Sequence, residues 1–152
     1  MKKLLSLLFL ATLACGGGAK EKDAKSPSGD SDEVQIEYVP IAVSWVKHFT
    51  KSAPADAARK LADDMLSRMQ ASSESLDAIA DAAIAADLGK SAVNDAKRRK
   101  MVTLPASKAG EADLPPDAKE ALAAFARKAK PGDVVDSPLG SGPVLVVARV
   151  AH

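Results

Sequence analysis

Apolar and polar residues alternate at the start of the region that we expect to fold, over residues 34–46. Val34, Ile36 and Tyr38 alternate with polar residues, and the segment is rich in β-branched and aromatic side chains. A period of two places the apolar side chains on one face, which predicts a β-strand. Pro40 removes one backbone donor, so we expect a strand edge, a bulge or a break between two short strands there.

The next segments show helical spacing. Over residues 55–70 the apolar positions repeat at i, i+3, i+4 and i+7, which predicts a helix with one buried face. A second, alanine-rich helix is expected over residues 74–88, with Ser73 as its N-cap and Gly89 just past its end. A third helix is expected over residues 92–99. The buried face of the first helix consists of Ala58, Leu61, Ala62, Met65, Leu66 and Met69.

A short strand, a loop and one helix are expected in the following part. Residues 101–104 predict the strand, and residues 105–113 predict a polar loop. The helix is expected over residues 117–129, with Pro116 in its first turn. Its inner face is expected to carry Ala118, Ala121, Leu122 and Phe125.

The C-terminal segment predicts a hairpin. Residues 134–135 predict a brief strand, residues 137–143 a turn rich in Gly and Pro, and residues 144–150 the most strand-like run of the chain. The fold class expected from this order is α+β, with a small sheet of three to four strands covered by three to four helices.

Residues 1–14 have the parts of a cleaved export signal. Two lysines precede an apolar run at residues 4–13, which ends in small residues beside the only cysteine, Cys15. The run is shorter than the ~20 apolar residues of a membrane span. Residues 12–15 (TLAC) resemble a lipobox, although the leucine stands two residues before the cysteine instead of three. This resemblance implies lipid attachment at Cys15; the alternative is an ordinary secretory leader with an incidental cysteine.

A disordered tether is expected between Cys15 and the folded part. Apart from Pro27, residues 16–33 contain no apolar residue larger than alanine, so they cannot bury enough surface to fold. As a flexible coil this segment spans roughly 20 to 25 Å. We therefore expect a lipoprotein signal peptide (1–14), a lipidated cysteine with its tether (15–33) and one folded domain (34–152).

The charge balance argues against a nucleic-acid partner. Residues 1–14 carry two lysines and no acid, so the mature chain has 19 basic and 20 acidic side chains. A net charge near zero points to no polyanionic partner. The basic run at residues 97–100 (KRRK) suits the dipole at the last turn of a helix, so we expect no nucleic acid to bind.

Neither a metal site nor a cofactor is expected. His48 and His152 are the two histidines, and the sequence suggests no partner for either, so we expect both in solvent. With one cysteine, spacing assembles no cluster of metal ligands. Of the few aromatic residues, Phe125 is expected in the core. For Trp45 two interpretations are open, packing in the core or lining a binding groove.

Several stretches of the chain resemble the parvulin-type peptidyl-prolyl cis-trans isomerases. Residues 41–45 (IAVSW) and 57–62 (AARKLA) are similar to the opening strand and first helix of that family. Residues 114–122 (LPPDAKEAL) are similar to the stretch leading into its last helix. Residues 130–135 (KPGDVV) and 137–140 (SPLG), followed by the valine-rich strand, are similar to its C-terminal hairpin. Together the stretches cover nearly all of the folded part.

The resemblance also predicts a substrate groove and shows what it lacks. Pro40 stands where the family has its first histidine, and Pro143 or Val144 stands where it has its second, so we expect no catalytic residue. Leu114 fills the Met or Leu position of the proline pocket, and Ala118 stands where a Phe is expected. The groove expected by resemblance is lined by Pro40, Trp45, Leu114, Ala118, Pro143 and Val144.

Rotation about a peptide bond is opposed by a barrier of ~18 to 20 kcal/mol, which a dry apolar pocket lowers by favouring the twisted geometry. The resemblance therefore implies an isomerase that acts on unfolded or proline-containing polypeptides during envelope protein folding. One alternative is a non-catalytic lipoprotein that binds a peptide or an envelope protein on the same scaffold. Another is a structural lipoprotein of unrelated α+β fold.

The expected location is a bacterial membrane, reached through the lipid anchor. Gly16 follows the anchored cysteine where an Asp often retains lipoproteins in the inner membrane. By resemblance to these sorting rules, we expect attachment to the outer membrane, facing the periplasm.

Overall fold

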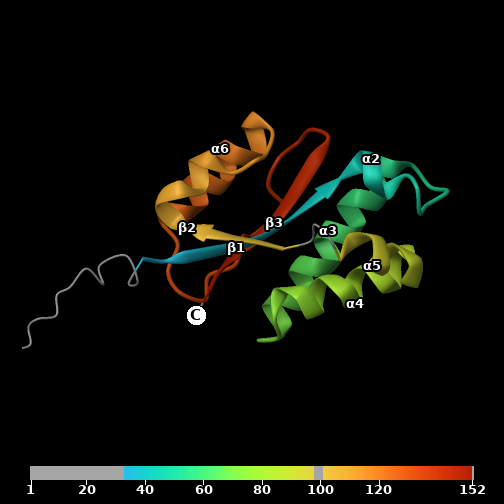
Figure 1. Cartoon of the computed structure of the whole chain (residues 1–152), viewed down its shortest axis with the longest axis horizontal. Coiled ribbons are helices and arrows are strands. Elements are labelled where there is room, and N and C mark those ends of the chain that lie inside the picture. The colour runs from blue at the N-terminus through green and yellow to red at the C-terminus, as the bar shows by residue number, and fades with distance from the viewer. Residues whose placement is uncertain (1–32, 98–100, 152) are drawn as a thin grey trace, which may run out of the picture. The chain divides into compact units, whose positions relative to one another are not determined.

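Strand β1 (Gln35–Ala42) is the middle strand of a three-stranded antiparallel sheet of order β2-β1-β3. In this computed structural model, which describes residues 33–97 and 101–151, β2 spans Val102–Pro105 and β3 spans Val144–Val150 (Figure 1). The α+β class and the last strand are confirmed. The brief strand expected over residues 134–135 is reduced to an isolated bridge.

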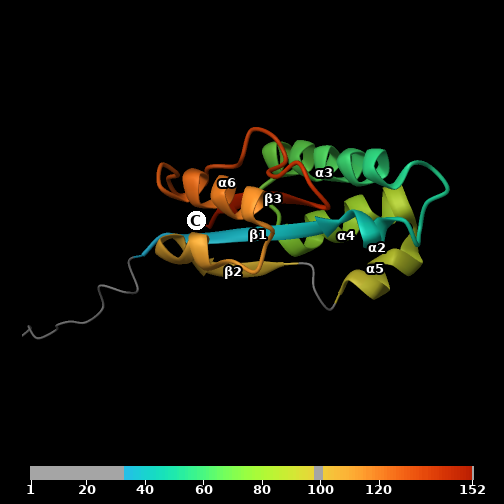
Figure 2. The ribbon, with the colours of Figure 1, turned by 90° about the horizontal axis from the view of Figure 1, so that it is seen from above.

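The two faces of the sheet are covered by different helices. α6 (Pro116–Ala126) lies on one face, and α3 (Pro54–Ala71), α4 (Leu76–Leu88) and α5 (Lys90–Ala96) lie toward the other (Figures 1 and 2). Successive side chains of a strand point to opposite faces. Val39 and Ile41 therefore face the three-helix side, and Pro40 faces the side of α6.

The buried face predicted for the first helix is confirmed, since Ala58, Leu61, Ala62, Met65, Leu66 and Met69 are all buried in α3. The N-cap of α4 is Ser75 and not Ser73, because the Ser75 hydroxyl accepts a hydrogen bond from the Ala78 N–H at 3.2 Å. Gly89 follows α4 as expected, with a φ of 95° that favours glycine. None of the described helices is long and apolar enough to cross a membrane.

Residues 43–46 were expected to belong to the first strand. This prediction is wrong, because they form the short helix α2 (Val43–Val46). The Val43 N–H still donates to the Pro143 carbonyl at 2.9 Å, and the Lys47 N–H then donates to the Val43 carbonyl at 3.2 Å. This turn buries Val46 completely. Valine prefers strands because it packs well on a half-buried surface, and here the helical turn provides that burial.

Strand β1 continues through Pro40, which pairs with Val146 of β3. The N–H groups of alternate residues point to opposite edges, so the donor that Pro40 lacks would point toward β2. The last pair of β1 with the described part of β2 is Tyr38 with Val102. The proline is tolerated in this middle strand because no bond to β3 is lost.

The loop expected over residues 105–113 contains a 3-10 helix, η3 (Ala106–Glu111), which buries Ala109. The helix expected over residues 117–129 ends earlier, at Ala126. On α6, Ala118 and Leu122 are buried as expected, whereas Ala121 and Phe125 are half-buried.

Some expectations concern residues outside the described part. The signal peptide, the lipidated Cys15 and nearly all of the tether fall within residues 1–32, which are not described. The same holds for residues 98–100 of the basic run and for His152. Within the described part, residues from Val34 onward form one compact unit.

Candidate functional site

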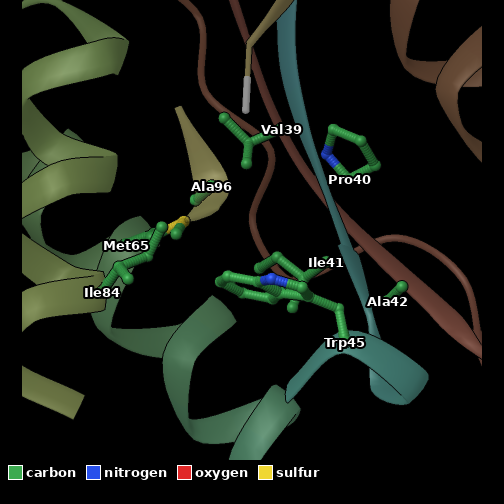
Figure 3. Close-up of a pocket in the computed structure, with 8 residues that line it drawn as sticks. All are labelled: Val39, Pro40, Ile41, Ala42, Trp45, Met65, Ile84 and Ala96. Atoms are coloured by element: carbon green, nitrogen blue, oxygen red, sulfur yellow. The ribbon is translucent and has the colours of Figure 1, made fainter. Parts of the chain in front are cut away.

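An apolar pocket of about 190 Å³ lies on the three-helix side of the sheet, at the C-terminal end of β1. We call it the Trp45 pocket. Figure 3 shows that Val39, Trp45 and Met65 surround the hollow, whereas Pro40 lies on the other side of the β1 ribbon. The complete lining consists of Val39, Pro40, Ile41, Ala42, Trp45, Met65, Ile84 and Ala96.

The fold positions this lining from five elements. β1 supplies one wall, and α3 and α4 supply Met65 and Ile84, which are 0% and 2% exposed. The turn into α2 carries Trp45 back over the end of β1. Ala96 of α5 has a single methyl group, so its side chain leaves the space open that a longer one would fill.

Trp45 is fixed by two contacts. Its indole Nε1 donates a hydrogen bond to Oδ2 of Asp95 on α5, at 2.6 Å. Its ring also lies against the ring of Phe49, with centroids 5.3 Å apart and planes inclined by 56°. Edge-inclined packing of this kind is favourable for aromatic rings. The indole therefore has a defined orientation although Trp45 is only half-buried.

A second, more polar hollow of about 480 Å³ shares Trp45 with the pocket. We call it the Asp95 groove. Trp45 and Ala42 belong to both hollows, so the indole separates an apolar space from a polar one. The groove is lined by Ala42, Ser44, Trp45, Lys47, His48 and Asp95.

The lining of the Trp45 pocket can bind but offers no acid, base or nucleophile. None of its eight side chains is ionisable in the ordinary pH range. In another protein, an engineered apolar cavity of about 150 Å³ holds benzene. The Trp45 pocket is therefore large enough for one apolar side chain or a small aromatic ring. Among residues 33–97 and 101–151, no group of acidic, histidine or cysteine residues could hold a metal ion.

The six residues expected to line one groove do not all lie on the same face of the sheet. Trp45 lies on the three-helix side, whereas Pro40, Leu114 and Ala118 lie on the side of α6. Val144 pairs with Ala42, and Pro40 pairs with Val146. Pro40 and Val144 are thus on the same face of adjacent strands, offset by two residues. Such diagonal neighbours are roughly 7 to 8 Å apart.

The space between Ala118 and Val144 is occupied by the chain itself. A β-carbon placed on Gly140 would lie 3.1 Å from the Ala118 β-carbon and 2.8 Å from the Val144 carbonyl oxygen. Ala118 is fully buried and Leu114 is 8% exposed. A proline ring could enter between Ala118 and Val144 only if Gly140 moved away.

The Gly140 turn is held in this place by α6. The Asp117 carboxylate accepts hydrogen bonds from the Ser141 N–H at 2.7 Å, the Ser141 hydroxyl at 3.2 Å and the Gly142 N–H at 3.2 Å. The Ser141 N–H is the main reason that the pKa of Asp117 is held below its ordinary value of 3.8.

Some residues of the Trp45 pocket and of the Asp95 groove could not be recognised from the sequence. Met65 was expected only as part of a helix face, and Asp95 carried no signal because its partner lies 50 positions away. His48 is exposed, as expected, at the edge of the Asp95 groove. Phe125 is half-buried and contributes to a separate polar hollow beside residues 133–136.

In comparisons with known proteins, no protein-family model, no curated protein and no solved structure matches this chain.

Proposed function

We propose that this chain is an exported lipoprotein whose folded domain, built on a parvulin-like scaffold, binds a partner polypeptide without isomerising it. The partner is an unfolded polypeptide or an envelope protein, and the Trp45 pocket encloses one of its apolar side chains. The observation that carries this proposal is the pocket itself, an open hollow lined by aliphatic and aromatic side chains. Soluble proteins normally fill such space, and apolar hollows are the usual form of binding sites.

The energy of this contact limits its strength. Burial of a leucine or phenylalanine side chain contributes about 1.5 to 3 kcal/mol. A dissociation constant of 1 mM corresponds to about 4 kcal/mol, so one side chain gives weak binding. A lipid anchor at Cys15 would compensate, because confinement at a membrane raises the effective concentration of partners held on the same surface. Because Gly16, and not an Asp, follows Cys15, we propose that the anchor lies in the outer membrane.

An isomerase is the second candidate, and the pairing of β1 with β3 favours it. The parvulin resemblance requires the first and last strands to be adjacent, with Pro40 and Val144 on the same side, and this is their arrangement. Against it stand the lack of histidine at both positions and the Gly140 turn between Ala118 and Val144. We therefore rank binding above turnover.

Binding is tested with a short Gly/Ser peptide that carries one phenylalanine, titrated into the purified mature chain. The methyl NMR signals of Met65 and Ile84 should shift progressively as the peptide is raised through the millimolar range, and a matched peptide with alanine should leave them in place. The variant Ala96→Leu should abolish the response, because its longer side chain fills the pocket. Ala123→Leu, half-buried on α6, is the matched control and should bind as wild type does. Unmoved methyl signals in the wild type would refute the proposal.

Turnover is tested by the isomerisation rate of a proline-containing peptide. A rate equal to that in buffer is expected. An acceleration that is lost in Leu114→Trp, which crowds the side of α6, would favour the isomerase instead.

Lipidation is tested by incorporation of labelled fatty acid in cells. The label should enter the wild-type chain and be absent from Cys15→Ser. Equal labelling of both chains, or of neither, would refute the anchor.

A further inference from the structure

One wall of the Trp45 pocket is joined by a hydrogen bond to an element that is distant in sequence. α2 contributes the indole of Trp45, and α5 contributes the Asp95 carboxylate that accepts its N–H. We propose that Asp95 is a positioning residue, which fixes the indole as the wall of the pocket and thereby sets the size of the apolar group that is accepted. This inference rests on the proposed function.

The local structure gives Trp45 little support of its own. α2 has only four residues, and its N-cap makes no side-chain hydrogen bond. Phe49 contacts one part of the indole, but an apolar ring contact does not fix the direction of the N–H. The Asp95 carboxylate does, because a hydrogen bond to a charged acceptor is short and directional. The distance of 2.6 Å is short even for a bond to a charged acceptor.

Asp95 is well placed to serve as the fixed partner. Its helix begins directly after Gly89, and both Ala92 and Ala96 bury their methyl groups against the core. These contacts hold α5 against the domain independently of Trp45. Ala96 also lines the pocket, so the residue next to Asp95 forms another part of its wall. The hydrogen bond therefore sets the separation between the walls formed by Trp45 and Ala96.

Loss of the bond would change the shape of the site. Because Trp45 separates the Trp45 pocket from the Asp95 groove, rotation of the indole would join the two hollows. The joined space would be wider and would admit water. A ring the size of phenylalanine would then lose its close contacts, whereas a larger ring would no longer be excluded.

The chain has a single tryptophan, so its fluorescence reports on this side chain alone. The variants are Asp95→Ala, which removes the acceptor, and Asp95→Asn, which keeps an acceptor oxygen. Asn94→Ala, at the exposed neighbouring position of α5, is the control. Acrylamide quenching measures the access of solvent to the indole. Titration with the phenylalanine peptide and with a naphthylalanine peptide measures selectivity.

In Asp95→Ala we expect acrylamide quenching to rise about twofold and the preference for phenylalanine over naphthylalanine to disappear. The affinity for the phenylalanine peptide should fall about tenfold, which corresponds to the loss of about one hydrogen bond. Asp95→Asn should restore most of each property, and Asn94→Ala should match the wild type. Unchanged quenching in Asp95→Ala would overturn the inference. If the wild type binds neither peptide, the proposed function fails, while quenching still decides whether Asp95 positions Trp45.

Discussion

Gly140 lies directly against Ala118, so close that the main chain at this point has room for no side chain. A β-carbon on Gly140 would lie 2.8 Å from the Val144 carbonyl oxygen and 3.1 Å from the Ala118 β-carbon, and Gly140 also has a φ of 91°. Both facts require glycine. The contact fills the space between Ala118 and Val144, whereas the apolar Trp45 pocket lies open on the opposite side of the sheet.

Substitution Gly140→Ala should therefore destabilise the fold by about 2 to 4 kcal/mol, from backbone strain at positive φ together with overpacking against Ala118. Urea unfolding followed by circular dichroism measures this loss. Gly142→Ala is the matched control, because a β-carbon there would meet only the Asp117 carboxylate at 3.7 Å. It should change stability by less than about 0.5 kcal/mol. Equal losses in the two variants would contradict the packing described.

The bonds from the Gly140 turn to Asp117 predict a dependence on pH. Because the folded state lowers the pKa of Asp117 below 3.8, the carboxylate stabilises the fold at higher pH, and this contribution is lost as the pH falls below 3.8 through the folded value. Thermal unfolding of Asp117→Asn should show a lower Tm than wild type at pH 6, and the difference should shrink in acid. Ser141→Ala, which removes only the hydroxyl donor, should have a smaller effect. A difference that stays constant down to pH 2 would rule out this linkage.

A charged side chain joins the sheet to the turn between α3 and α4. Arg149 Nε donates to Glu37 Oε2 at 2.7 Å, and Arg149 Nη1 donates to the Glu74 carbonyl at 2.8 Å. The Arg149 and Glu37 side chains are only 12% and 19% exposed. Arg149→Met should cost about 1 to 3 kcal/mol, because Glu37 is left without this partner.

The control for this pair is Arg68→Met on α3. Arg68 and its partner Asp64 are more exposed, at 40% and 29%, and lie four residues apart on one helix. Exposed pairs of this kind contribute about 0.5 kcal/mol or less. Equal urea midpoints for the two variants would show that burial of the Arg149 pair adds nothing.

The ion pair between Lys60 and Asp87 joins α3 to α4 and satisfies only one oxygen of the carboxylate. Asp87 is 8% exposed on its side chain, and its Oδ2 has no hydrogen-bond partner among the described residues. Lys60→Met should lower the urea midpoint, because the buried carboxylate loses the cation that compensates it. Lys60→Met combined with Asp87→Leu should recover stability relative to the single variant. A double variant less stable than the single one would show that Asp87 contributes beyond this pair.

Much of the fold could be predicted from periodicity. The stripe from Ala58 to Met69 and the run at residues 144–150 are buried as their patterns predict. The spacing of apolar residues along a helix or strand decides which of them share a face, and this spacing can be read from neighbouring residues alone. The short elements were less predictable. Val43 and Val46 favour a strand by composition but form a helical turn, because β3 offers no partner beyond the Val43 bond to Pro143 and the turn buries Val46 in the core.

The site was predictable only in part. Pro40 and Val144 could be placed on neighbouring strands by resemblance, and β1 and β3 do pair. The occupation of the space between them by Gly140 could not be foreseen, since it depends on a turn that Asp117 holds from another element.

The sequence by itself determined the long periodic elements, the α+β class and the small number of histidine and cysteine side chains, because these depend on residue type and short spacing alone. Only the tertiary structure decided which face of the sheet is open. That choice depends on contacts such as Trp45 with Asp95 and Gly140 with Ala118, whose partners lie 50 and 22 residues apart. Contacts at such separations are set by how the helices pack on the sheet, and no local pattern records them.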